Sequence, residues 1–108
     1  MKCGSLSGKG HKHIRNGNFE DALNCYQKAL SYSDNEGGSA ILLECIARSH
    51  ARLGNIDQAL LMANECISKL KILDCPEPVF KNTKTRVAAL IDALENCDKN
   101  KINELLNI

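Results

Sequence analysis

A seven-residue motif occurs twice in this chain at a fixed spacing. Residues 17–23 read GNFEDAL and residues 54–60 read GNIDQAL, so the motif returns after 37 positions. Each copy follows one segment with helical spacing of its apolar residues and begins another. A period of this length is typical of stacked helix-turn-helix units, which bury their apolar faces against one another. The repeat therefore predicts an all-α fold, a short right-handed α-solenoid of antiparallel helical hairpins.

Size, charge and cysteine content limit the classes of protein that remain. The chain has 108 residues, enough for one small domain, and a net charge of +1, which gives no global attraction to nucleic acid or to an anionic membrane. Its apolar runs are too short to cross a bilayer, and no secretory leader follows Met1. The six cysteines form no C-x-x-C pair, and Cys25, Cys45 and Cys66 fall within helical patterns. We therefore expect free thiols in a reducing, cytoplasmic compartment, with Cys3 and Cys75 exposed.

Apolar periodicity and turn residues divide the chain into helices. The spacing predicts helices over about 6–16, 19–33, 39–53, 56–73 and 79–96. These helices are expected to form one domain: repeat one over 5–36, repeat two over 39–73, a capping helix over 77–97 and a short tail over 98–108. Ile102, Leu105 and Leu106 in that tail are compatible with a last short turn or with partial disorder.

The two copies resemble the tetratricopeptide repeat family, whose unit is a helix pair of about 34 residues. The family places small residues where the two helices cross closely, and glycine followed by Asn or Asp at the turn. The matching positions are Gly10, Gly17, Ala22, Tyr26 and Ala29 in the first copy, and Ala47, Gly54, Ala59, Ala63 and Cys66 in the second. The chain departs from the family at His13 and His50, where a tyrosine is usual, and at Asp34, where a proline usually closes the unit.

The resemblance implies a scaffold or adaptor without catalytic activity, in which the first helix of each unit lines a concave groove for a peptide or helix of a partner protein. By position, the residues expected to line this groove are Ser7, His11, Ile14, Arg15, Ile41, Glu44, Arg48, Arg52 and, from the fifth helix, Lys84. Positive side chains outnumber negative ones in this set. Because arginine can hold a carboxylate through two parallel hydrogen bonds, an acidic peptide is favoured.

Other interpretations of the same residues remain open. Glu44, Arg48 and Arg52 are spaced by four, so they can equally form a charge ladder on a solvated face. A subgroup of the family clamps acidic chaperone tails with a lysine and two asparagines, but this chain has Ser7, His11 and Cys45 at those places. Self-association as a homodimer, or membership of a longer solenoid, would also fit a first helix that carries few apolar residues.

The sequence offers little that could carry chemistry. His11 and His13 are two residues apart on a predicted helix, so they face different directions and cannot easily share a metal ion. The central cysteines lie on apolar stripes, where burial raises a thiol pKa and disfavours a nucleophile. The early basic residues have no interleaved aromatic side chains for stacking on bases. We therefore expect no metal, no cofactor, no enzymatic activity and no nucleic-acid or membrane partner.

Overall fold

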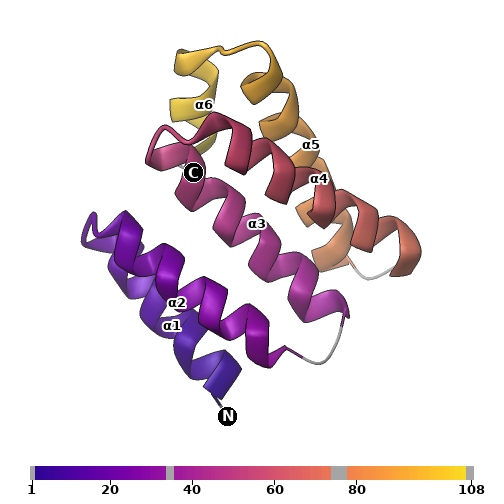
Figure 1. Ribbon diagram of the computed structural model, residues 1–108. Coiled ribbons are helices and arrows are strands. Elements are labelled where there is room, and N and C mark those ends of the chain that lie inside the picture. Colours follow the sequence, from indigo (N-terminus) through magenta and orange to yellow (C-terminus); the bar gives the residue numbers. More distant parts are fainter. Residues whose placement is uncertain (1, 34–35, 74–77, 107–108) are drawn as a thin grey trace.

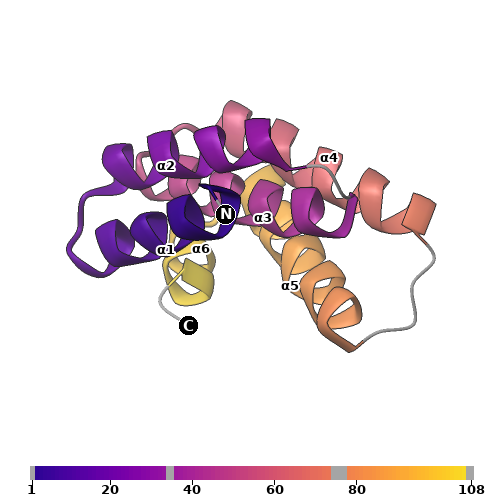
Figure 2. The same cartoon turned by 90° about the horizontal axis from the view of Figure 1, so that it is seen from below.

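The computed structural model describes residues 2–33, 36–73 and 78–106. These residues form six helices and no strand, which confirms the predicted all-α fold (Figure 1). The helices are α1 (Lys2–Arg15), α2 (Phe19–Tyr32), α3 (Glu36–Arg52), α4 (Ile56–Leu73), α5 (Pro78–Glu95) and α6 (Lys99–Leu106). Figure 2 shows α2 and α4 as an outer layer, α1 and α3 beneath them, and α5 and α6 on the far side of α3.

One kind of turn joins the two helices of each hairpin. Its central residue has a positive φ, and this residue is Gly17 at 80°, Gly54 at 83° and Cys97 at 50°. The residue after it donates its backbone N–H to the carbonyl five positions earlier, which ties off the end of the first helix. These closing hydrogen bonds are Asn18 to His13 at 2.8 Å, Asn55 to His50 at 2.9 Å and Asp98 to Ala93 at 3.1 Å. The turn between α5 and α6 thus repeats the geometry of the two recognised copies.

The sequence predicts a short tail over residues 98–108, but most of this segment is a helix that completes a third hairpin. Residues 99–106 form α6, and its side chains Ile102 and Leu106 are buried. Ile102 stands where Ala22 and Ala59 stand in the first two hairpins, because its N–H bonds to Asp98 just as theirs bond to Asn18 and Asn55. Helix α5, which was expected to be a capping helix, is therefore the first helix of a third hairpin, and the second helix of that hairpin is the short α6.

The core consists of two clusters of buried side chains that meet at α3. The smaller joins α2 to one face of α3 and comprises Ala22, Tyr26, Ala29, Leu42 and Ile46. The larger joins another face of α3 to α4, α5 and α6, with Leu43, Ala47, Ala63, Cys66, Val87 and Leu94 among its members. No described residue from 38 to 52 is exposed to solvent. Helix α3 is therefore the central element of the molecule.

Small side chains occupy the places where helices cross closely. Ala22, Ala29, Ala47, Ala59, Ala63 and Cys66 are all fully buried. The Cys66 thiol donates to the carbonyl of Ala40 at 3.1 Å, across the crossing of α4 and α3. A Cβ atom added to Gly10 would lie 2.6 Å from Cε1 of Tyr26, so α1 can approach α2 only through a glycine. These are the positions at which the repeat pattern calls for a small residue.

Some expectations fall on parts of the chain that the structure leaves undescribed. They concern Asp34, Cys75 and the side chains of Cys3 and Ser7. Over the described residues, no helix combines the length and the apolarity that crossing a bilayer requires.

Candidate functional site

A groove of about 500 Å³ opens between the first helices of the three hairpins. Helix α3 supplies its floor, α1 and α2 one wall, and α5 the other. The described side chains that line it are His11, Ile14, Tyr26, Ile41, Glu44, Cys45, Arg48, Arg52 and Arg86. Helices α1, α3 and α5 are the first helices of the three hairpins, and stacking of similar hairpins brings their first helices to one face of the molecule.

Most of the residues expected at the groove do line it. They are His11, Ile14, Ile41, Glu44, Arg48 and Arg52. Arg15 and Lys84 are exposed and lie outside the lining, and the side chain of Ser7 is not described. On α5 it is Arg86, two residues after Lys84, whose side chain lines the groove.

Tyr26, Cys45 and Arg86 line the groove although the sequence pattern did not assign them there. Tyr26 and Cys45 were read as core positions, and each does have a buried side: the ring of Tyr26 packs in the smaller cluster. One feature of the sequence could have indicated a partner such as Arg86. Glu44 lies within the apolar run from Ile41 to Ile46 of α3, and a carboxylate that is buried needs a cationic partner.

Glu44 is 5% exposed and is held by two helices. Its carboxylate accepts two hydrogen bonds from Arg86, one from Nε at 3.0 Å and one from Nη2 at 3.1 Å. Nη1 of Arg48, one helical turn along α3, lies 3.9 Å away. The bond to Glu44 raises the pKa of the Arg86 guanidinium. The predicted ladder of Glu44 and Arg48 is present, but its carboxylate is buried and also joins α3 to Arg86 of α5, whose side chain is exposed.

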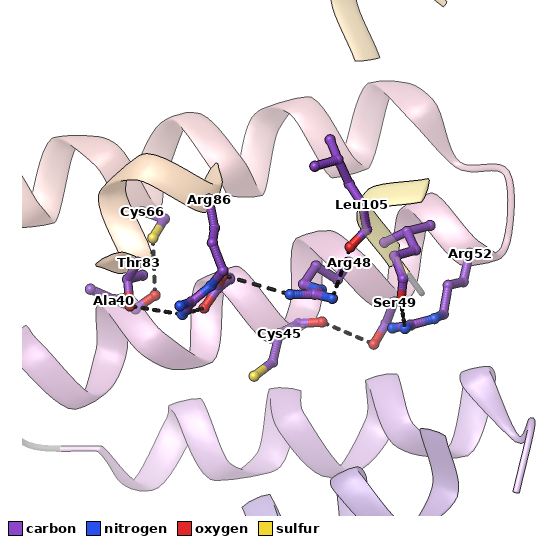
Figure 3. Close-up of polar contacts among 11 residues, drawn as sticks. Ala40, Cys45, Arg48, Ser49, Arg52, Cys66, Thr83, Arg86 and Leu105 are labelled. Carbon is purple, nitrogen blue, oxygen red and sulfur yellow. Dashed lines mark hydrogen bonds and ion pairs between the residues drawn. The ribbon is translucent and has the colours of Figure 1, made fainter. Parts of the chain in front are cut away.

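Arg48 and Arg52 point from α3 toward the end of α6 (Figure 3). Nη2 of Arg48 donates to the carbonyl of Leu105 at 3.2 Å, and Nη2 of Arg52 donates to the carbonyl of Leu106. The Arg52 guanidinium also lies 5.5 Å from the centre of the Phe19 ring, a cation–π distance. Burial, followed by the like charge of Arg48, lowers the pKa of Arg52. The two arginines therefore form one end of the groove. They contact α2 and α6, and Arg48 also lies near Glu44 of their own helix, α3.

The middle of the groove is polar. The hydroxyl of Tyr26 and Nδ1 of His11 are 2.7 Å apart, and their rings meet edge to face with centroids 5.4 Å apart. Burial raises the pKa of the Tyr26 phenol, and it raises the pKa of the Cys45 thiol to about 11. The Tyr26 phenol and the Cys45 thiol are therefore protonated at neutral pH, and neither adds a negative charge to the groove.

The described residues offer no cluster of metal-binding side chains. Burial also raises the pKa of the Cys66 thiol to about 12, the opposite of what a nucleophilic cysteine needs. Cys97, at the turn between α5 and α6, is the exposed thiol among the described cysteines, all of which are free. The arrangement at the groove is suited to binding through hydrogen bonds and charge.

Three helical hairpins with repeated turns and a groove along their first helices define a protein of the α-solenoid class. Residues 4–36, the first hairpin, match the family model of the tetratricopeptide repeat, and this match supports the resemblance found in the sequence. No curated protein and no solved structure matches the chain significantly. Repeats of this family generally mediate interactions between proteins.

Proposed function

We propose that this protein is an adaptor that holds an acidic peptide or helix of a partner protein in the groove between α1, α3 and α5. The observation that supports this function is the charge of the groove, whose described lining has three arginines and one glutamate. Glu44 is already bonded to Arg86, so the guanidinium groups of Arg48 and Arg52 carry the net charge at the other end. Each guanidinium has five N–H donors, two of which can hold a carboxylate through parallel hydrogen bonds.

The groove also has apolar side chains in its lining. Ile14 of α1 and Ile41 of α3 line it and are partly exposed. A segment that carries an aliphatic residue beside one or two carboxylates would match both the apolar and the charged parts of this lining. The family's peptide-holding role and the free thiols of the described cysteines support a binding role, without catalysis, in a reducing cytoplasm.

A capture experiment tests this function. The double variant Arg48→Glu, Arg52→Glu reverses the charge of the groove end, whereas Lys28→Glu, Lys71→Glu reverses two exposed lysines on the outer helices α2 and α4. Proteins retained from a cell lysate are identified by mass spectrometry. We expect a partner that wild type and the outer-helix variant retain and the groove variant loses, because like charges then repel an acidic segment.

Two controls make the capture result decisive. Circular dichroism and thermal unfolding must first show that the groove variant is folded, since both arginines also bond to α6. A partner that the folded groove variant still retains would show that recognition does not use this end of the groove. A partner lost equally from the outer-helix variant would point to the overall charge of the protein and not to the groove.

Self-association has less support from the described residues. Leu6 and Ile14, apolar residues of the first helix, pack against the smaller core cluster and are only partly exposed. Among the side chains that the structure describes, the exposed large apolar ones are Tyr32 on α2 and Leu61 on α4, on separate helices. Apolar residues scattered singly in this way are usual on a monomer.

A further inference from the structure

The arginine end of the groove already has an occupant from this chain. The carbonyls of Leu105 and Leu106 belong to the last turn of α6, where no following helical N–H is available to them. Arg48 and Arg52 supply the missing donors, as Figure 3 shows for Arg48 and Leu105. The positive charges also lie at the negative end of the α6 dipole. The two side chains expected to bind a partner are thus the two that hold α6 in place.

Helix α6 is held by few other contacts. It has eight residues, whereas isolated helices shorter than about 12–15 residues are marginal in water. Five of its residues are exposed, and only Ile102 and Leu106 are buried. A cavity of about 30 Å³ remains between Leu105 and Leu106 of α6 and the side chains Glu44, Arg48, Arg86 and Leu90. Short length, two anchors and incomplete packing are the features of a segment that opens locally at low free energy.

We infer that α6 is an intramolecular competitor, which covers Arg48 and Arg52 until an acidic segment of a partner displaces it. The chemistry favours exchange, because a carboxylate carries a full charge and accepts two parallel hydrogen bonds, whereas each α6 carbonyl is neutral and takes one. The free protein then binds with an affinity reduced by the fraction of molecules in which α6 is undocked. This inference rests on the proposed function and adds to it a built-in control of access to the groove.

The test uses two proline variants of the full chain with octaglutamate as the probe. Asn103→Pro puts the ring in the middle of α6, at an exposed position, where it removes a helical hydrogen bond and clashes with the preceding turn. Lys99→Pro puts the same ring at the first residue of α6, a position that proline favours. Lys99→Pro also removes a positive charge, which weakens attraction to octaglutamate and so cannot imitate the expected gain.

Binding of fluorescein-labelled octaglutamate is followed by fluorescence anisotropy at one ionic strength. We expect Asn103→Pro to bind at least fivefold more tightly than wild type, and Lys99→Pro to bind no more tightly than wild type. A tenfold gain would mean that α6 is undocked in about one wild-type molecule in ten.

A second measurement needs no variant and holds even if Asn103→Pro fails to fold. Hydrogen exchange of wild-type amides at Ile102–Leu106 is compared with and without saturating octaglutamate. Displacement predicts faster exchange in α6 when the probe is bound, while the amides of α3 and α4 are unchanged or slower.

The outcomes separate the two proposals. One outcome is that octaglutamate binds wild type, while hydrogen exchange in α6 and the affinity of Asn103→Pro are unchanged. Competition by α6 is then wrong, and the proposed binding of acidic segments in the groove remains. If octaglutamate binds neither wild type nor folded Asn103→Pro, the proposed binding of acidic segments in the groove is wrong, and α6 has no binding to control. Tighter binding by Asn103→Pro, or faster exchange of α6 in bound wild type, supports the competition.

Discussion

At the scale of single residues, Gly10 determines how closely the first hairpin can close. A methyl group there would lie 2.6 Å from the ring of Tyr26, which is 2% exposed and bonded to His11. Gly8, on the same helix, has no atom within 4 Å of its added Cβ. The two glycines therefore offer the same substitution with opposite physical consequences.

We expect Gly10→Ala to lower the free energy of unfolding by about 1–3 kcal/mol, the usual cost of overpacking a close contact. Gly8→Ala should leave it unchanged or raise it by up to about 1 kcal/mol, because alanine is the better helix former. Urea unfolding followed by circular dichroism measures both. Equal effects of the two substitutions would show that α1 is not packed on Tyr26 in the way described.

The sequence pattern was enough to identify the tightly packed positions, but it did not show which charged side chains pair with one another. Glycine and alanine at Gly10, Ala22 and Ala59 follow from the motif, since only small groups fit where helices cross. The hydrogen bonds between Glu44 and Arg86 could not be predicted from the sequence. They join residues 42 positions apart, on helices whose relative rotation depends on tertiary packing. That same rotation put Lys84 outside the groove and Arg86 inside it.

At the scale of elements, the three hairpins use one turn, but only two of them have glycine at its left-handed residue. Cys97 takes that place with a φ of 50°, a conformation that costs a residue with a Cβ roughly 1–2 kcal/mol. This absence of glycine is also why the sequence concealed the third hairpin: residues 97–99 read CDK where the recognised copies read GNF and GNI. The helices before it were predicted to within a few residues of their observed bounds.

Replacing Cys97 with glycine should stabilise the hairpin of α5 and α6. We expect Cys97→Gly to raise the free energy of unfolding by about 0.5–1 kcal/mol, since relief of the strained φ exceeds the greater entropy of glycine in the unfolded chain. Gly54→Ala is the matched reverse change, and it should lower that free energy by about 1 kcal/mol. Thermal unfolding of wild type, Cys97→Gly and Gly54→Ala shows the order of their stabilities. A Cys97→Gly protein less stable than wild type would mean that the Cys97 side chain contributes more than its backbone costs.

At the scale of the whole molecule, α3 contributes side chains to both core clusters. Leu42 belongs to the cluster shared with α2, and its neighbour Leu43 belongs to the cluster shared with α4 and α5. Neither cluster can lose its α3 residues without uncovering the other. We therefore propose that the described hairpins constitute a single domain.

Leu42→Ala and Leu43→Ala test this cooperativity with one substitution on two faces of the same helix. Each should lower the free energy of unfolding by about 2–5 kcal/mol, because each leaves a cavity in a buried cluster. Each should also shift a single transition, measured by calorimetry. Two separate transitions, with only the first moved by Leu42→Ala, would show instead that the first hairpin unfolds independently of the rest.

The lack of any exposed residue between positions 38 and 52 also bears on how this protein can diverge. Most side chains there belong to a core cluster, line the groove or contact α6, so a substitution that alters partner choice on α3 is expected to alter the stability of the fold as well. New specificity can be acquired at lower cost on the flanking helices, where Lys12, Arg15 and Lys84 face solvent. Among descendants of this chain, α3 should therefore be the slowest helix to drift, and the rims of α1 and α5 the places where lineages come to recognise different partners.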